Sequence, residues 1–381
     1  MTAEQINGGA RGDSLRILSP SGLSNKKPHF LTQRKWWAYA IRECFGFQVI
    51  DMRNQYEKKN NSWENLSGFR YAHRGLFRQP WSASKKHPAA ASVARGPLGL
   101  IGKKPVKRTK EEVCWKEDVS LWKAKGKRIV PENSMEAFRL AVRNGFGSEL
   151  DVHLTADGCL AVFHDDNLMR ITSIDGKIED MTWQELSKVR LLGTDHRIPL
   201  LEEVLDLYTS DAALTGRQDT RSSAPLHLPV IIELKAEGNV SDLCRRVMET
   251  VDRYPTLNYC IESFDPRVVL WLRRNRPDVI RGQLTENFMK SKEAVRQWGH
   301  LMTFGMWSAA PDILTGPDFI SSKFVDRRNI FIRFSHRCGV KQVNWIIRNQ
   351  KDLDTVDGEG GLGIFERFAP GRSTPPFTPE R

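Results

Sequence analysis

The sequence has no apolar run long enough for a membrane span, no CxxC cysteine pair, and no glycine-rich dinucleotide fingerprint after an apolar strand segment. A transmembrane helix needs about 20 mostly apolar residues, so we expect a soluble protein. The six cysteines are scattered, and the start of the chain carries no apolar core of a secretory signal. Both features favour reduced thiols and a cytoplasmic location.

Net negative charge is also lacking, because the chain carries a formal charge of +12. This excess of positive charge is unevenly distributed along the chain. Residues 78–130 contain 14 Lys+Arg against 4 Asp+Glu, and residues 1–77 contain 12 against 6, which leaves −4 for residues 131–381. A mildly acidic main portion argues against nucleic acid as its substrate, although a basic segment can still contact phosphate-rich surfaces.

We expect three parts: an N-terminal extension (1–68), a main domain (69–366) and a Pro-rich tail (367–381). The extension begins with a stretch that composition predicts to be disordered. The aromatic run 36–41 then predicts a short amphipathic helix. We favour a helix packed over an open end of the main domain, and the alternative is an interfacial membrane anchor.

The main domain is interrupted after its first strand by the basic insertion 78–130. A structureless loop of this length inside a compact domain is unusual. We favour a passive or flexible loop. The alternatives are a lid, or a surface for peripheral contact with an anionic membrane.

Short apolar strand segments alternate with helical patterns through the main domain. Eight strands are expected, at 69–73, 148–153, 159–164, 229–233, 257–261, 279–284, 318–321 and 340–347. Helices are expected from a capping box at Asn133 and Glu136 to about residue 144, over about 200–208 and 240–254, and after Pro266. Strand–helix alternation predicts a parallel sheet, and eight strands are the number in a TIM (β/α)8 barrel. A doubly wound sheet is the alternative, but the sequence lacks the glycine-rich dinucleotide fingerprint that is typical of that fold.

The stretch 147–166 carries the first chemical signal. Read as a strand with alternating faces, it places Glu149, Asp151 and His153 on one side. Acidic groups on an apolar strand are costly unless a charged group lies between them, and divalent cations prefer carboxylate oxygens. The hairpin thus indicates a metal site, with a solvated hairpin as the alternative.

Other polar residues fall at strand ends, where a TIM barrel carries its catalytic groups. Together they are His73, Arg74, Glu149, Asp151, His164, Glu233 and Lys235. Carboxylates hold a cation, cations bind an anionic substrate, and histidines titrate near neutral pH. The set suits hydrolysis of a phosphate ester.

These residues lie in motifs that resemble the glycerophosphodiester phosphodiesterase family. The motifs follow in order over about 69–77 and 131–366, and they are Ala72-His73-Arg74-Gly75, Pro131-Glu132-Asn133-Ser134, Glu149-Leu150-Asp151-Val152, Thr155-Ala156-Asp157-Gly158, Phe163-His164-Asp165-Asp166, Ile232-Glu233-Leu234-Lys235, Glu262-Ser263-Phe264-Asp265 and Val343-Asn344-Trp345. Two features depart from the family pattern. The insertion separates the first two motifs, and Ile346 stands where Thr commonly follows the tryptophan.

The resemblance implies a TIM-barrel enzyme that uses calcium or magnesium (Ca²⁺ or Mg²⁺) to cleave glycerophosphodiesters into an alcohol and glycerol 3-phosphate. By position it implies that the metal ligands are Glu149, Asp151 and Glu233, that the acid–base pair is His73 and His164, that Arg74 and Lys235 bind the phosphate, and that Trp345 lines the substrate mouth. The order of the two histidine roles stays open, as does attack by water or by a substrate hydroxyl. The role of Glu132 stays open, either in the active site or in the scaffold that supports it.

Two other functions are considered. The first is a lysophospholipase D-like phosphodiesterase that works at membrane surfaces. The second is a non-catalytic barrel scaffold, and the complete set of histidines and carboxylates argues against it. We expect a small-molecule phosphodiester substrate, and the sequence leaves the oligomeric state open.

Overall fold

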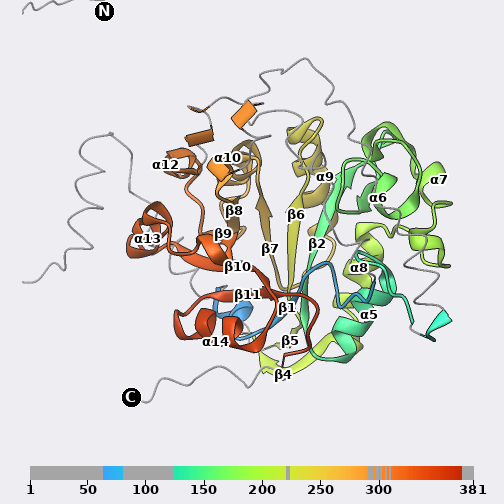
Figure 1. Cartoon of the computed structure of the whole chain (residues 1–381), viewed down its shortest axis with the longest axis horizontal. Helices are drawn as coiled ribbons and strands as arrows, with labels where there is room; N and C mark the ends of the chain where they lie inside the picture. Colours follow the sequence, from blue (N-terminus) through green and yellow to red (C-terminus); the bar gives the residue numbers. More distant parts are fainter. Residues whose placement is uncertain are drawn as a thin grey trace, which may run out of the picture. The chain divides into compact units, whose positions relative to one another are not determined.

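Eight parallel strands close into a barrel in the computed structural model, which describes residues 63–79, 124–126, 128–219, 224–290 and 310–370, together with 295–296, 300, 303–304 and 307–308 (Figure 1). Each strand pairs with the next around the ring, and β1 pairs with both β2 and β11. The strands, in ring order, are β1 (Tyr71–Ala72), β2 (Gly147–Leu154), β6 (Val230–Leu234), β7 (Tyr259–Ser263), β8 (Arg281–Thr285), β9 (Phe319–Lys323), β10 (Lys341–Ile347) and β11 (Leu362–Phe365). The predicted TIM barrel is confirmed.

Helices surround this barrel (Figure 1). Those described are α5 (Met135–Arg143), α6 (Met169–Thr172), α7 (Trp183–Leu186), α8 (Leu201–Tyr208), α9 (Val240–Val251), α10 (Pro266–Asn275), α12 (Ala310–Thr315), α13 (Ile330–Arg337) and α14 (Gln350–Gly358). Short 3-10 helices are η1 (Ile178–Asp180), η2 (Leu191–Gly193), η3 (Asp211–Ala213), η4 (Phe288–Lys290) and η5 (Phe324–Asp326). The helices predicted near 200–208, near 240–254 and after Pro266 are confirmed as α8, α9 and α10.

One predicted barrel strand is wrong, and one barrel strand was missed. The segment 159–164 forms β3 (Leu160–Val162), which pairs antiparallel with β2 and does not join the ring. The tight Asp157-Gly158 turn explains this, because a short turn joins antiparallel strands whereas parallel strands need a crossover of a dozen or more residues. The eighth barrel strand is β11, a four-residue segment whose Gly363 weakens its strand signal. A second small sheet pairs β4 (Leu214–Gln218) with β5 (Pro225–His227).

The start of α5 also differs from the prediction. The N-cap is Ser134, whose hydroxyl accepts a hydrogen bond from the backbone nitrogen of Ala137 at 3.3 Å. Asn133 has a φ of 51° instead, a left-handed conformation that Asn tolerates better than most residues. Both residue types are good caps, so the sequence alone did not separate them. Because Ser134 caps the helix, the side chain of Asn133 is available for another contact.

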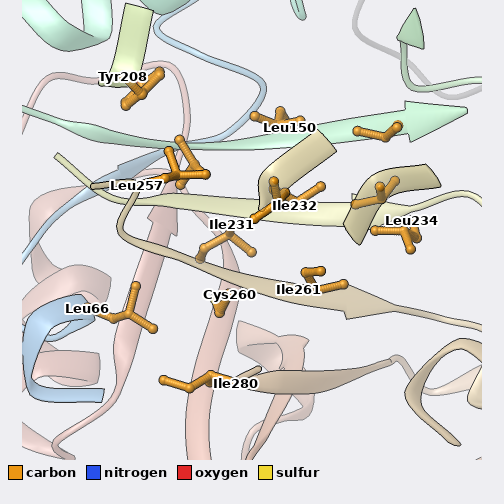
Figure 2. Close-up of a cluster of buried hydrophobic side chains, with 14 of the residues drawn as sticks. Leu66, Leu150, Tyr208, Ile231, Ile232, Leu234, Leu257, Cys260, Ile261 and Ile280 are labelled. Atoms are coloured by element: carbon orange, nitrogen blue, oxygen red, sulfur yellow. The ribbon is translucent and has the colours of Figure 1, made fainter. Parts of the chain in front are cut away.

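The main apolar core is built from the barrel strands and the helices packed on them. Figure 2 shows part of it, with Leu150 on β2, Ile231 and Ile232 on β6, and Ile261 on β7 turned toward neighbouring apolar side chains. Residues before the first strand contribute as well, because Leu66 is fully buried in the same cluster. Burial of such side chains stabilises the fold by about 1.5–3 kcal/mol each. This rigid core holds the strand ends, and therefore the polar groups on them, in fixed positions.

Several predicted segments lie outside the described residues. They are the disordered start and the aromatic helix of the N-terminal extension, nearly all of the basic insertion, and most of the Pro-rich tail. Both ends of the insertion are described. Arg78 and Val130 form an antiparallel bridge, with backbone N–O distances of 2.8 and 2.7 Å. No helix in the described part of the chain is long and apolar enough to cross a membrane.

Candidate active site

A pocket at the C-terminal ends of the barrel strands brings together most of the residues that the sequence singled out. It has an empty volume of about 350 Å³, part of it open to solvent, and is lined by His73, Arg74, Glu149, His164, Glu233, Glu262, Phe264, Leu284, Trp345, Ile346 and Ile364. The two other predicted residues, Asp151 and Lys235, are buried beside this lining and contact it. All eight predicted site residues therefore lie at one mouth, although the chain between the first and last of them exceeds 270 residues.

Three carboxylates form a compact group on β2 and β6. Asp151 is the strand neighbour of Glu233, and Glu149 precedes it by two residues on the same face of β2. Each offers an oxygen atom, and these atoms lie within 4.8 Å of one another. All three residues are buried, Asp151 completely. The set can therefore surround one small cation, as predicted.

Lys235 compensates part of this negative charge. Its Nζ lies 2.7 Å from Asp151 Oδ1 and also contacts Glu233. Burial raises the pKa of Asp151, but Lys235 and the other nearby cations outweigh burial and hold that pKa well below its usual range. Burial lowers the pKa of Lys235, and Asp151 with Glu233 reverse this shift, so that the lysine pKa is raised. The lysine is thus a fixed positive charge.

The pKa of Glu149 shifts in the opposite direction to that of Asp151. Burial first, and then the negative charges of Asp151 and Glu233, raise the pKa of Glu149 well above its usual range. Lys235 and Arg74 together therefore leave this cluster short of positive charge. A divalent cation would supply the missing charge and would keep Glu149 ionised. Carboxylate oxygens are also the donors that Ca²⁺ and Mg²⁺ prefer, so the residues fit such an ion.

His73 follows β1 and is held by the far end of the chain. Its Nδ1 lies 3.1 Å from Oε2 of Glu366, the residue directly after β11. Because the pKa of Glu366 is lowered, despite burial, by His73 and Arg348, this carboxylate is ionised and accepts the hydrogen bond from Nδ1. The other ring nitrogen, Nε2, lies 3.9 Å from Glu149. Burial and then Arg74 lower the pKa of His73, which favours the neutral ring.

His164 lies just after β3 and has its own carboxylate. Its Nδ1 is 2.5 Å from Oδ1 of Asp165. Asp165 contacts Arg170, and Arg170 in turn contacts Glu132. All four side chains are at least 90 % buried. A carboxylate partner fixes the tautomer and orientation of an imidazole. In both pocket histidines the carboxylate is at Nδ1, so Nε2 is the nitrogen left for the substrate.

The turn after His73 places Arg74 in contact with two acidic side chains, those of Glu149 and Glu132. The backbone nitrogen of Arg74 donates to Glu149 Oε2 at 3.0 Å, and its Nη1 donates to Glu132 Oε1 at 2.6 Å. Gly75 is required next, since a Cβ there would lie 2.8 Å from the backbone of Ala137 and φ is 74°. Arg74 therefore lines the pocket while Glu132 holds its guanidinium.

The insertion does not separate the two motifs in space. Beyond the Arg78–Val130 bridge, Gln79 Nε2 donates to Glu132 Oε2 at 2.6 Å, and the Glu132 backbone nitrogen donates to Gln79 Oε1 at 3.0 Å. Glu132 thus meets Arg74, Gln79 and Arg170. This geometry favours a positioning role for Glu132. Its neighbour Asn133 donates from Nδ2 to Asp151 Oδ2 at 2.8 Å.

One wall of the pocket is apolar. Trp345 on β10 packs edge to face against Phe264, with ring centroids 5.9 Å apart. Nζ of Lys323 lies 5.4 Å from the Trp345 ring centroid. Leu284, Ile346 and Ile364 complete the apolar lining. The mouth therefore offers charge on one side and apolar surface on the other.

Sequence reasoning missed several residues of the site. Glu262 lines the pocket next to Glu233 on the neighbouring strand, and burial with Glu233 raises its pKa to about 8. The sequence shows the motif that contains Glu262, but it does not show that this residue lies beside Glu233 in the barrel. Asp165 adjoins a predicted histidine, and the side-chain partners Arg170 and Glu366 had no local signal.

Comparison with known proteins identifies the family of the chain. Residues 124–365 match the model of the glycerophosphoryl diester phosphodiesterase family. The chain is 46 % identical over 100 residues to a Bacillus altitudinis glycerophosphodiester phosphodiesterase, covering 24 % of this chain and 41 % of that protein. It is 33 % identical over 136 residues to human lysophospholipase D GDPD1, covering 32 % and 37 %. These matches therefore span less than half of either relative.

A solved structure shares the fold. The Oleispira antarctica phosphodiesterase, solved with its product sn-glycerol-3-phosphate, aligns over 80 % of this chain and 94 % of its own at a TM-score of 0.51 and 17 % identity. The family match covers well over half of the chain. The motif turn with His73 precedes the matched range, and the structure joins it to the same pocket. The chain belongs to the glycerophosphoryl diester phosphodiesterase family.

Proposed function

We propose that this protein hydrolyses glycerophosphodiesters to an alcohol and glycerol 3-phosphate with the help of a divalent cation, Ca²⁺ or Mg²⁺. One observation carries the proposal. Three carboxylates that can hold a cation lie in or directly beside a pocket that is also lined by two histidines, each fixed by a carboxylate partner. Family membership supports the same reaction. A phosphodiester hydrolase of this kind would act in phospholipid and glycerol metabolism.

Glu149, Asp151 and Glu233 would hold the cation. When bound, a divalent cation supplies positive charge that polarises a phosphoryl oxygen and stabilises the charge of the transition state. Asn133 supports this set by donating to Asp151. The side chain of Asp151 is thereby oriented before any ligand arrives, as second partners of metal ligands commonly do.

The two histidines divide proton transfer. One takes a proton from the attacking oxygen, which is water or a substrate hydroxyl, and the other gives a proton to the departing alcohol. Nδ1 of each ring is engaged by a carboxylate, Glu366 for His73 and Asp165 for His164. Nε2 is therefore the atom of each ring that exchanges a proton with the substrate.

Arg74 and Lys235 would bind the phosphate. Arg74 lines the pocket, and its guanidinium has donors beyond the one given to Glu132. Lys235 sits behind Asp151 and Glu233 and contributes mainly through its charge. Both cations favour a phosphodiester anion and the charge that grows on it during reaction.

A lysophospholipid is the second candidate substrate. The apolar wall formed by Phe264, Leu284, Trp345, Ile346 and Ile364 favours it, because an acyl chain needs apolar surface beside a polar headgroup site. The human relative named lysophospholipase D supports the same class. Trp345 would contact the substrate on this wall.

A direct assay separates these substrates. Purified protein is given glycerophosphocholine or lysophosphatidylcholine with Ca²⁺, with Mg²⁺ or with a chelator, and released choline is measured. We expect metal-dependent release from at least one substrate. No release from either with any metal would leave the non-catalytic scaffold as the better account.

The domain division and the location follow from the sequence and stay proposals. We propose a catalytic barrel over 69–366 with the insertion 78–130, flanked by the extension 1–68 and the tail 367–381. The burial of Trp63 and Leu66 among barrel residues supports a boundary slightly earlier than residue 69. We propose a cytoplasmic location as well.

A further inference from the structure

Helix α13 and the turn before it expose large apolar side chains. Val325 in η5 is 76 % exposed, and Ile330 and Phe334 on α13 are 71 % and 51 % exposed. Ile330 and Phe334 are four residues apart, so they lie one above the other on a single helix face. Single exposed apolar residues are ordinary, but neighbouring ones on the same helix face can form an apolar patch that contacts a partner.

The apolar stripe continues into an aromatic cluster. Phe331 packs edge to face on Trp307 with ring centroids 5.3 Å apart, and on Phe304 at 6.3 Å. Phe304 is itself 45 % exposed. Ile332 turns inward and is buried, which anchors the helix. The outward apolar side chains are therefore on a fixed element and are not needed to hold α13 in place.

Basic side chains flank this stripe. Arg328, Arg333 and Arg337 are exposed, and none of them forms an ion pair with another described residue. Arg333 and Arg337 are again four residues apart and form a second row beside Ile330 and Phe334. The only acidic residue of the segment 324–340 is Asp326, which accepts from the Asn287 backbone nitrogen at 3.0 Å. Among the residues that the structure describes, no ion pair offsets the positive charge of these three arginines.

The position of this surface relates it to the pocket. Val325 follows Lys323 by two residues, so their Cα atoms are at most about 7 Å apart, and the Lys323 ammonium lies over the pocket residue Trp345. η5 therefore leaves the barrel at the pocket side, and α13 continues from it on the left of the barrel in Figure 1. A flat partner on this surface would cover the rim of the mouth.

We propose that Val325, Ile330 and Phe334, together with Arg328, Arg333 and Arg337, form a docking surface for an anionic phospholipid bilayer. We call these six residues the α13 surface. Apolar side chains on one row and arginines on the next are the pattern of helices that lie in a membrane interface. Each arginine gains from the negative surface potential. Docking does not depend on the hydrolysis proposed above, because none of the six residues lines the pocket.

Vesicle sedimentation tests the proposal with the full chain. The vesicles are phosphatidylcholine alone, or phosphatidylcholine mixed with phosphatidylglycerol. We expect binding to the mixed vesicles that weakens as salt is raised. We expect the double variants Ile330→Ser/Phe334→Ser and Arg333→Gln/Arg337→Gln each to lower that binding about tenfold or more.

Matched controls lie elsewhere on the barrel. Arg139 and Arg143 are exposed, four residues apart, on α5, and Leu214 on β4 is 41 % exposed. Arg139→Gln/Arg143→Gln and Leu214→Ser should bind within twofold of the wild type. All variants should keep wild-type turnover of soluble glycerophosphocholine, if the wild type has it, and wild-type unfolding curves.

Any of four outcomes would overturn the proposal. The wild type fails to sediment with the mixed vesicles, or the α13 variants bind as well as the wild type, or the controls lose as much binding as the α13 variants. A wild type that self-associates through the α13 surface, while the α13 variants stay monomeric, would assign the surface to a second copy of the chain and also contradict lipid docking.

Discussion

His73 and Glu366 join the two ends of the barrel, with Nδ1 of the histidine 3.1 Å from Oε2 of the glutamate. His73 follows the first barrel strand and Glu366 follows the last, and β1 and β11 are paired neighbours. Closure of the ring therefore assembles the histidine with its carboxylate. In the proposed reaction, this contact fixes the ring so that Nε2 faces the substrate.

Replacing Glu366 tests that positioning role. Glu366→Gln removes a charge that raises the pKa of His73 against burial and Arg74, which lower it. We expect turnover to fall by roughly 10- to 100-fold, and the limb of the pH–rate profile that reports His73 to move to lower pH. Arg348→Gln is the control, since it removes an arginine partner of Glu366 and leaves the histidine contact intact. An unchanged profile in Glu366→Gln would contradict the role.

The two histidines can be told apart by the leaving group. Alanine at His73 or at His164 should each lower turnover of glycerophosphocholine by about 100-fold or more. With a p-nitrophenyl phosphodiester the leaving group needs little protonation, so the variant that lacks the general acid should recover most of its rate. We expect one variant to recover and the other to stay slow. Near-normal turnover by both on glycerophosphocholine would rule out the scheme.

Arg170 should matter for stability as much as for activity. Its guanidinium lies between Asp165 and Glu132, and all three side chains are at least 90 % buried. Arg170→Leu would remove the arginine of the buried Asp165 and leave Glu132 with Arg74 as its cation, at a cost of about 3–5 kcal/mol in the free energy of unfolding. Arg170→Lys should cost less, because it keeps the charge. Urea unfolding measures both, and equal stability of Arg170→Leu and the wild type would contradict the network.

The lowered pKa of buried His153 leads to a specific prediction for how stability depends on pH. Burial, and then the charge of Lys235, lower the pKa of His153 to about 4, whereas an unfolded histidine titrates near about 6.5. The unfolded chain therefore takes up the proton first, and stability falls as pH drops from about 6.5 toward about 4. Between pH 7.5 and pH 5 the wild type should lose roughly 2 kcal/mol more than His153→Gln. Parallel losses in urea unfolding at the two pH values would contradict this.

Local patterns predicted the parts of the site that lie on strand ends. Glu149, Asp151 and Glu233 alternate with apolar residues, and the number of strands indicated a ring that would bring them together. The prediction failed where the answer depended on pairing. The segment 159–164 has the composition of a barrel strand, but its short turn pairs it antiparallel with β2.

Long-range partners left no local trace in the sequence. Glu366 is 293 residues from His73, and Arg170 is 38 residues from Glu132. The α13 surface was missed for a different reason. Ile330 and Phe334 stand at helical spacing, which ordinarily indicates a side that packs inward, and only the fold places them outward. Their exposure comes from the tertiary structure alone.

In the proposed reaction, Glu149, Asp151 and Glu233 hold a divalent cation that turnover requires. The most direct test measures turnover of glycerophosphocholine by the wild type and by Asp151→Asn, first with a chelator and then with Ca²⁺ or Mg²⁺ restored. We predict that chelation abolishes wild-type turnover, that one of the two metals restores it, and that Asp151→Asn stays at least about 100-fold slower with either. Full turnover by the chelated wild type, or by Asp151→Asn, would contradict the account.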